Sequence, residues 1–233
     1  MAVSNPQCPQ RCRGAGRLAT PTGRRRSSTF GDEVRVSLLL EAAENTRAHH
    51  LLSLIASTGL RKGEALALRW VDVELGAEHP QLRVRGTLAR IDGRLLITAP
   101  KTAKSRRTLP VSGPAAALLK AQHTEQVAER LRAGSQWNDL GLVFTTVTGL
   151  PVDPSNVLRE IKKAAAKAGL PQVTVHALRH SAATTMLEAG IHLRGVSDLL
   201  GHADIRTTAE VYGHLSDEVA RSAMDTLSSA FKI

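Results

Sequence analysis

From Gly31 onward, apolar residues recur at steps of three and four positions over most of the chain, a spacing that puts them on one face of an α-helix. This pattern predicts helices around residues 34–39 and 51–56, and a short helix that begins at Arg61. Ser112-Gly113-Pro114 predicts the start of a long helix that runs to about Ala133. Further helices are predicted from Asp153 to about Ala168 and over residues 174–189, 193–200, 204–212 and 216–230. The expected fold is therefore mostly α.

One stretch breaks the helical pattern. Short strand-like runs occur at residues 82–86, 95–99 and 108–111, and Asp92-Gly93 and the basic segment 101–107 bound them. We expect these runs to form a small three-stranded antiparallel sheet. The prediction for the whole chain is an α+β domain, a helical bundle with one small sheet.

Positive charge is distributed unevenly along the chain. Of the formal net charge of +10, residues 1–30 contribute six arginines and no acid, whereas the rest of the chain has 25 basic and 21 acidic side chains. Residues 1–30 also lack apolar periodicity, so they are predicted to be a basic disordered tail that precedes a domain over 31–233. Eight basic residues lie between Arg83 and Arg107, against the single acid Asp92. This basic segment falls on the predicted strands and their turns. It could face the phosphates of a nucleic acid or be a solvated charged surface, and charge alone leaves both open.

Several classes of protein are excluded by composition. The only two cysteines, Cys8 and Cys12, lie in the tail, which rules out a disulfide scaffold and gives too few ligands to predict a metal site. No apolar run approaches the roughly 20 residues that a membrane span needs. The N-terminal sequence lacks the apolar segment of a secretory signal. The expected location is therefore the cytoplasm, with no membrane partner.

Five segments carry residue types that phosphate chemistry uses. Arg61 follows a glycine break at a helix start, where its guanidinium fork could bind two phosphate oxygens, and Glu64 lies three residues on. His176 and Arg179 are separated by one helical turn and share a face. The other segments are Leu199-Leu200-Gly201-His202, Val211-Tyr212-Gly213-His214 and Pro100-Lys101-Thr102. Each alone has a common structural explanation, such as a helix-start ion pair, a packed tyrosine or a solvated lysine.

Taken in order, these residues resemble the catalytic domain of the tyrosine recombinase (phage integrase) family over residues 31–230. The resemblance implies that a tyrosine attacks a DNA phosphate, forms a covalent 3′-phosphotyrosyl link and releases a 5′-hydroxyl, which a second strand later replaces. It also implies a role for each matching position: Tyr212 as nucleophile, Arg61 and Arg179 as the phosphate clamp, His176 as acid/base, His202 as phosphate ligand, Lys101 as general acid and Glu64 as support.

This division of labour is chemically consistent. A phenol with a pKa of about 10 is a poor nucleophile without assistance, and two guanidiniums can offset the charge that grows on phosphorus. The covalent link conserves the ester's energy, in agreement with the lack of a Walker loop, so neither a metal nor a nucleotide cofactor is expected. The expected partner is double-stranded DNA, and Lys104, Arg106 and Arg107 are expected to make further contacts with it. Copies of the chain are expected to assemble on DNA in a tetrameric synapse, associated with the nucleoid.

Two features leave alternatives open. Family members usually carry an N-terminal core-binding domain, and only about 30 residues precede the catalytic domain here, so we expect that domain to be absent and DNA binding to be weak and nonspecific. The chain could then be a truncated, non-catalytic DNA-binding remnant, or an enzyme resembling a telomere resolvase or a type IB topoisomerase. The apolar stripe of the predicted helix 216–230 could pack on a neighbouring protomer or on its own domain.

Overall fold

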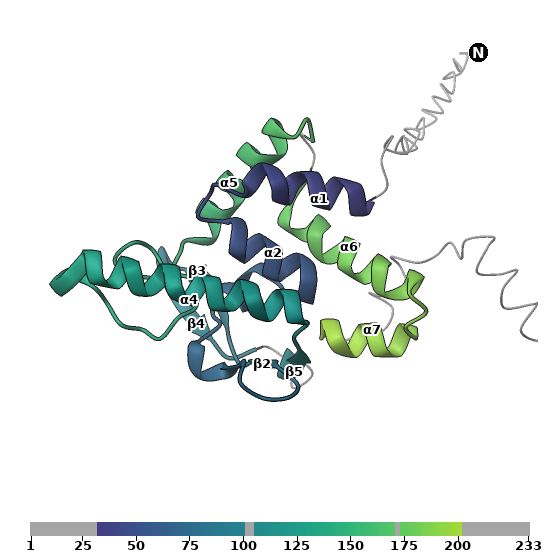
Figure 1. The fold of residues 1–233 in the computed structure, drawn as a ribbon, viewed down its shortest axis with the longest axis horizontal. Helices are drawn as coiled ribbons and strands as arrows, with labels where there is room; N and C mark the ends of the chain where they lie inside the picture. The colour runs from purple at the N-terminus through teal and green to yellow at the C-terminus, as the bar shows by residue number, and fades with distance from the viewer. Residues whose placement is uncertain (1–31, 101–104, 171–172, 202–233) are drawn as a thin grey trace, which may run out of the picture.

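The computed structural model describes residues 32–100, 105–170 and 173–201, and α-helices make up most of these ranges (Figure 1). The helices are α1 (Asp32–Ala43), α2 (His49–Thr58), α3 (Lys62–Leu66), α4 (Gly113–Ala133), α5 (Pro154–Lys167), α6 (Val175–Glu188) and α7 (Leu193–Leu200). Two short 3₁₀ turns, Trp70–Asp72 and Gly134–Gln136, complete the helical part. The mostly α class is confirmed. The tail 1–30 and the predicted helices 204–212 and 216–230 lie outside the described residues.

Helix α2 forms the centre of the core. Its residues Leu52, Leu54 and Ile55 are fully buried, because α1, α4 and α6 pack around it (Figure 1). Burying a leucine or isoleucine side chain contributes roughly 1.5–3 kcal/mol relative to leaving it exposed. The helix is therefore apolar on more than one face and acts as the support on which the site-bearing helices α3 and α6 rest.

The predicted three-stranded antiparallel sheet is present, but its strands differ in part from those predicted. It consists of β1 (Val73–Glu74), β2 (Gln81–Val84) and β5 (Arg107–Pro110), in the order β1-β2-β5. The predicted strand 95–99 is instead β4 (Arg94–Thr98), which pairs with β3 (Thr87–Ile91) in a separate hairpin.

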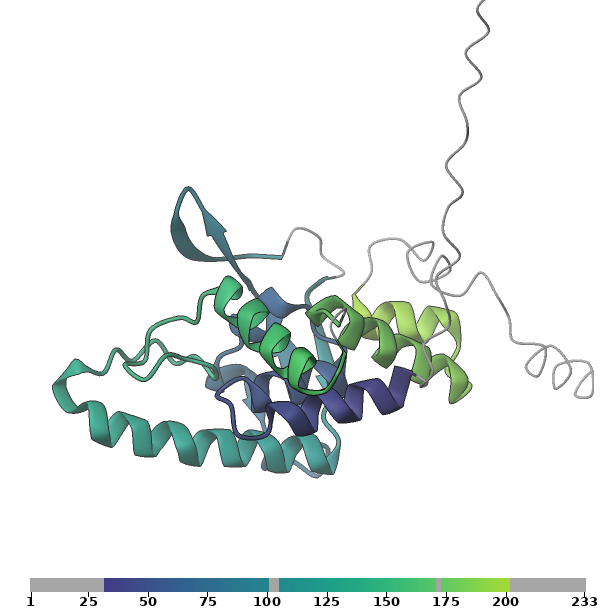
Figure 2. The same cartoon turned by 90° about the horizontal axis from the view of Figure 1, so that it is seen from above.

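The turn between β3 and β4 explains that correction. Ile91 pairs with Arg94, so Asp92 and Gly93 form a two-residue loop, and both have positive φ, 47° and 79°. This loop suits a type I′ hairpin, in which the strand that precedes Asp92 must pair with the strand that follows Gly93. β4 therefore forms its backbone hydrogen bonds with β3 and is not part of the three-stranded sheet. Figure 2 shows the hairpin extending from the body on the side opposite α4.

Two predicted helix starts have side-chain caps. The Ser112 hydroxyl accepts a hydrogen bond from the Ala115 amide at the start of α4, and Asp153 accepts one from the Ser155 amide at the start of α5. Both helices carry a proline in the first turn, where no intrahelical amide hydrogen bond is lost. Within the described ranges, no helix is both long enough and apolar enough to cross a membrane.

Candidate active site

The site is built around the turn that joins α2 to α3. Gly59 ends α2 with a φ of +65°, and a Cβ at this position would lie 2.4 Å from Leu200 Cδ2, so only glycine allows α7 to approach this closely. The chain then extends through Leu60, and Arg61 is the N-cap residue of α3. The end of α2, the start of α3 and the end of α7 therefore meet at one point.

Arg61 is held at this point by Glu64 and by α7. Its backbone amide and its Nη1 donate to the two Glu64 carboxylate oxygens at 2.9 and 2.8 Å, and its Nη2 donates to the Gly201 carbonyl at 3.0 Å. About 41% of the Arg61 side chain is still exposed. The guanidinium is thus oriented by the protein and remains accessible to a ligand.

Arg179 lies on α6 and is almost completely buried, with 4% of its surface exposed. Its Nη1 donates to the Gly59 carbonyl and its Nη2 to the Leu200 carbonyl, the latter at 2.6 Å. Burial lowers the pKa of Arg179 to about 9, and repulsion from Arg61 acts in the same direction. The guanidinium stays protonated at neutral pH, and in a poorly solvated position its attraction for an anion is stronger than at the surface.

A third arginine, Arg107 of β5, shares Glu64 with Arg61. Its Nη2 and Nη1 donate to the Glu64 carboxylate at 2.9 and 3.3 Å, and its Nε donates to the Leu199 carbonyl at 2.6 Å. Burial raises the pKa of Glu64, but the hydrogen bond and charge of Arg107, together with the hydrogen bonds from Arg61, outweigh burial and hold that pKa below its ordinary value. The carboxylate is therefore ionised at neutral pH.

These residues define an arginine cluster: Arg61, Arg107 and Arg179 around Glu64. Three guanidiniums and one carboxylate leave an excess of two positive charges among these described groups. Charge of this sign and size favours binding of an anion such as a phosphate, and favours even more a reaction in which that phosphate gains negative charge.

Backbone carbonyls, which the sequence does not predict as site groups, complete the cluster. Three consecutive carbonyls at the end of α7 accept hydrogen bonds from three different arginines: Leu199 from Arg107, Leu200 from Arg179 and Gly201 from Arg61. The last carbonyls of a helix lack intrahelical partners and form the negative end of its dipole, so they attract cations. The Leu-Gly helix end at residues 200–201 was the available sequence signal.

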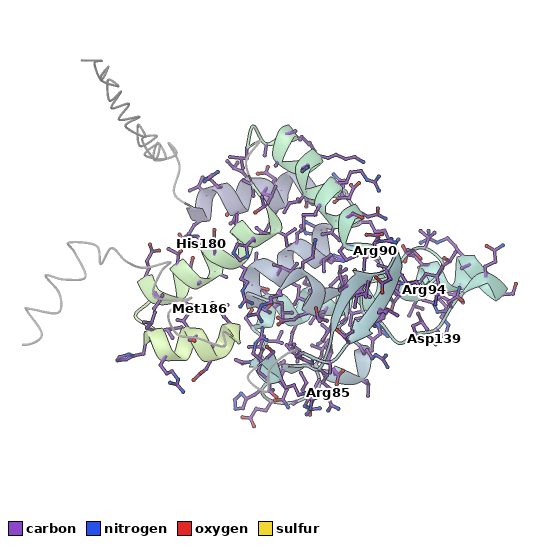
Figure 3. All side chains as sticks on the ribbon, turned by 180° about the vertical axis from the view of Figure 1, so that it is seen from behind. Arg85, Arg90, Arg94, Asp139, His180 and Met186 are labelled. Atoms are coloured by element: carbon purple, nitrogen blue, oxygen red, sulfur yellow. The ribbon has the colours of Figure 1, made fainter. Side chains whose placement is uncertain are left out.

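His176 occupies an exposed position one helical turn before Arg179 on α6. The helix begins at Thr174, whose hydroxyl accepts from the Ala177 amide at 3.3 Å. Within the described ranges, His176 makes no hydrogen bond to the arginine cluster. His180, four residues further along the same helix, is also exposed (Figure 3). The shared helix face places His176 on the side of Arg179.

The predicted DNA-contact residues lie in different surroundings. Arg106 is exposed and lines a shallow groove of about 660 Å³ with Arg83, Arg85 and Thr108. Arg107 also borders this groove, but its side chain is only 7% exposed and its guanidinium binds Glu64. Lys101, Lys104, His202 and Tyr212 lie outside the described residues. Gly201, which directly precedes His202 in the sequence, is buried in the cluster.

Other parts of the described structure offer no competing site of this chemistry. Among the residues described, no three or more His, Cys, Asp or Glu side chains gather closely enough to hold a metal ion. A cavity of about 500 Å³, bordered by Leu51 of α2, Gln122 of α4 and Val157 of α5, contains none of the predicted site residues. The predicted residues that the structure does bring together are thus Arg61, Glu64, Arg107 and Arg179.

Comparisons with known proteins concern the family and the fold of the chain. The chain is 37% identical over 215 residues to a protein named tyrosine recombinase XerC-like from Caldanaerobacter subterraneus subsp. tengcongensis, a match that covers 87% of this chain and 54% of that protein. The crystal structure of XerA recombinase has a TM-score of 0.64 and 28% identity, over 89% of this chain and 66% of that one. The Tn1549 transposon integrase, solved with transposon right-end DNA, shares the fold with a TM-score of 0.68 and 20% identity, over 85% of this chain and 65% of that one.

The extent of the family match decides the assignment. The chain spans about half the length of the curated relatives it matches. The sequence model of the phage integrase family nevertheless matches residues 31–219, which is well over half of the chain. This range includes all four residues of the arginine cluster. This chain therefore belongs to the phage integrase family of tyrosine recombinases.

Proposed function

We propose that this chain breaks and rejoins DNA strands through a covalent 3′-phosphotyrosyl intermediate formed on Tyr212. The observation that carries the proposal is the convergence of Arg61 and Arg179, from two separate segments, on neighbouring carbonyls at the end of α7. The excess of two positive charges in the arginine cluster suits the additional negative charge that a phosphodiester gains as it is attacked.

The proposed reaction conserves the number of ester bonds. The phenolic oxygen of Tyr212 forms a bond to phosphorus while the bond from phosphorus to the 5′ oxygen breaks. His176 takes the phenolic proton, and the Lys101 ammonium gives a proton to the leaving 5′ oxygen. Arg61, Arg179 and His202 bind the non-bridging oxygens. Rejoining is the reverse, with a 5′-hydroxyl as nucleophile, so no nucleotide is consumed.

The proposal extends to partners and domain organisation. Residues 31–233 would form the catalytic domain, double-stranded DNA would be the substrate, and Lys104, Arg106 and Arg107 would add contacts to it. The Tn1549 integrase, a structural neighbour, was solved with DNA, which supports this choice of substrate. Copies of the chain would assemble on DNA into a tetrameric synapse in the cytoplasm, associated with the nucleoid. Chemical cross-linking with and without a duplex tests the assembly, which should require DNA.

A nicked suicide duplex, from which the cleaved 5′ fragment dissociates, tests the reaction itself. Wild-type protein should form an adduct with DNA that survives denaturing electrophoresis, and Tyr212→Phe should bind DNA but form no adduct. Wild-type protein that binds without an adduct would instead support the non-catalytic remnant. Relaxation of supercoiled DNA without strand exchange would point to an enzyme that resembles a type IB topoisomerase.

A further inference from the structure

Arg107 connects three parts of the site that are distant in sequence. From β5 it binds both carboxylate oxygens of Glu64 on α3 and the Leu199 carbonyl near the end of α7, and its Nη1 also donates to the Ser105 carbonyl at 3.2 Å. These partners occupy every nitrogen of the guanidinium. Arg179 is buried to a similar extent, but its hydrogen bonds use only Nη1 and Nη2 and go to neutral carbonyls, whereas the Arg107 guanidinium is already paired with a carboxylate.

The strand register explains why Arg107 points inward. Side chains at alternate positions of a strand share a face. Leu109, two residues on, is 2% exposed, and Val84, the partner of Arg107 on β2, is 3% exposed. Arg106 and Thr108, in contrast, are exposed. The same alternation that builds the apolar face of the sheet therefore directs the Arg107 side chain toward Glu64.

The end of α7 is packed directly against this guanidinium. A Cβ built on Gly201 would lie 2.7 Å from Arg107 Nη1 and 3.1 Å from its Cζ, and the Gly201 φ of +66° also favours glycine. Gly201 has no side chain, but its backbone carbonyl accepts a hydrogen bond from Arg61. Any shift of Arg107 would therefore change both groups that orient Arg61, the Glu64 carboxylate and the Gly201 carbonyl.

We propose that Arg107 is a positioning residue for strand cleavage, and that it acts by fixing Glu64 and the end of α7, which in turn orient Arg61. This inference rests on the proposed function, and it replaces for Arg107 the role of direct DNA contact. Small displacements of reacting groups are costly: a shift of about 1 Å can reduce a rate by about 100-fold.

Single-turnover cleavage of the suicide duplex at saturating protein tests this role. Arg107→Gln should slow adduct formation by about 10- to 100-fold and leave the DNA dissociation constant, and its dependence on salt, unchanged. Arg47→Gln is the matched control, because Arg47 also binds a glutamate, Glu129, and donates to a backbone carbonyl, that of Thr145 at 2.8 Å, outside the site. It should lower the melting temperature without slowing cleavage.

A double-mutant cycle distinguishes positioning from an independent contribution. If Arg107 acts through Glu64, then combining Arg107→Gln with Glu64→Gln should slow cleavage about as much as the more severe single variant. If the two act independently, their effects should multiply, which would overturn the proposed coupling. Arg107→Lys keeps the charge but cannot bind Glu64 and Leu199 together, so it should fold and still cleave at least about 10-fold more slowly than wild type.

Each remaining outcome has one interpretation. A wild-type cleavage rate for Arg107→Lys and for Arg107→Gln would overturn the positioning role. A salt dependence of DNA binding that weakens by about 0.9 in log–log slope would identify Arg107 as a phosphate ligand instead. If Arg107→Gln does not fold, Arg107→Lys alone decides between these outcomes. The absence of any adduct with wild-type protein would refute the proposed function itself, which separates that failure from failure of the positioning role.

Discussion

Arginines occur in two regions of this molecule under opposite conditions. In the arginine cluster, Arg107 and Arg179 are 7% and 4% exposed, and each binds two or more separate groups. Along β2, the link that follows it and the projecting hairpin, the side chains of Arg83, Arg85 and Arg90 are 39%, 66% and 50% exposed. They pair with Glu74, Asp72 and Asp153 respectively, and Arg90 also donates to the Gly93 carbonyl. Figure 3 shows where Arg85 and Arg90 lie. The two regions have the same residue type and similar numbers of ion pairs.

Burial, rather than the number of charges, separates their roles. An exposed ion pair is screened by water and salt and contributes about 0–1 kcal/mol, whereas removing one partner of a buried pair leaves an uncompensated charge. The arginine cluster therefore has a fixed geometry, which the proposed reaction at one phosphate requires. The exposed arginines named above are each neutralised by a carboxylate, so these pairs add little net positive charge to the surface.

The largest expected contrast is in stability. Glu64→Gln leaves Arg107 and Arg61 without their shared carboxylate and should lower the free energy of unfolding by about 3–5 kcal/mol. Glu74→Gln removes the exposed partner of Arg83 and should lower it by less than about 1 kcal/mol. Urea denaturation of both variants at pH 7 measures the difference, and equal losses would contradict the distinction between the two regions.

The next contrast is in rate. Arg179→Gln removes a buried, oriented donor and should reduce single-turnover cleavage by about 100- to 1000-fold, the range found when one oriented donor to a reacting oxyanion is removed. Arg94→Gln, on the projecting hairpin, should change the rate at saturating protein by less than about threefold. A comparable loss in Arg94→Gln would show that the hairpin takes part in the chemical step.

The pH dependence of stability sharpens the comparison further. The pKa of Glu64 is lower in the folded protein than in the unfolded chain, so its stabilising contribution is complete above the unfolded pKa of about 4.3 and is lost as the pH falls through the lower folded pKa. The difference in unfolding free energy between wild type and Glu64→Gln should therefore shrink as urea titrations move from pH 6 to pH 3. A difference that is independent of pH would show that packing, and not charge, accounts for the effect of Glu64.

The sequence predicts the site where the contacts are local. Arg61 and Glu64 are three residues apart at a helix start, and the Gly59 break before them is visible in the sequence, so their proximity could be inferred. The backbone carbonyls of Leu199 and Leu200 could not, because every residue has a carbonyl and only the tertiary fold brings these two to Arg107 and Arg179.

Arg107 and β3 show what a closer use of strand geometry could have added. Charge alone predicts that Arg107 contacts DNA like its basic neighbours, but its spacing of two from Leu109 places both on the inward face of β5. β3 was missed because only Leu88 is buried among its five residues, so its apolar alternation is weak. The Asp92-Gly93 turn nevertheless required a strand before it as well as after it.

The smallest expected effect is the contribution of a single exposed arginine to DNA binding. Arg106→Gln should weaken binding to all duplex sequences alike and reduce the log–log slope of affinity against salt by about 0.9, because one phosphate contact and its counterion are lost. Fluorescence anisotropy between 50 and 200 mM salt measures this slope, with Arg132→Gln on the exposed face of α4 as a control that should leave it unchanged. The cleavage rate at saturating protein should stay the same, because Arg106 is exposed and the hydrogen bonds that hold Glu64 come from Arg61 and Arg107. If the rate fell as well, the exposed Arg106 and the buried Arg107 that follows it would form one functional unit, and the division between the two regions would not hold at the start of β5.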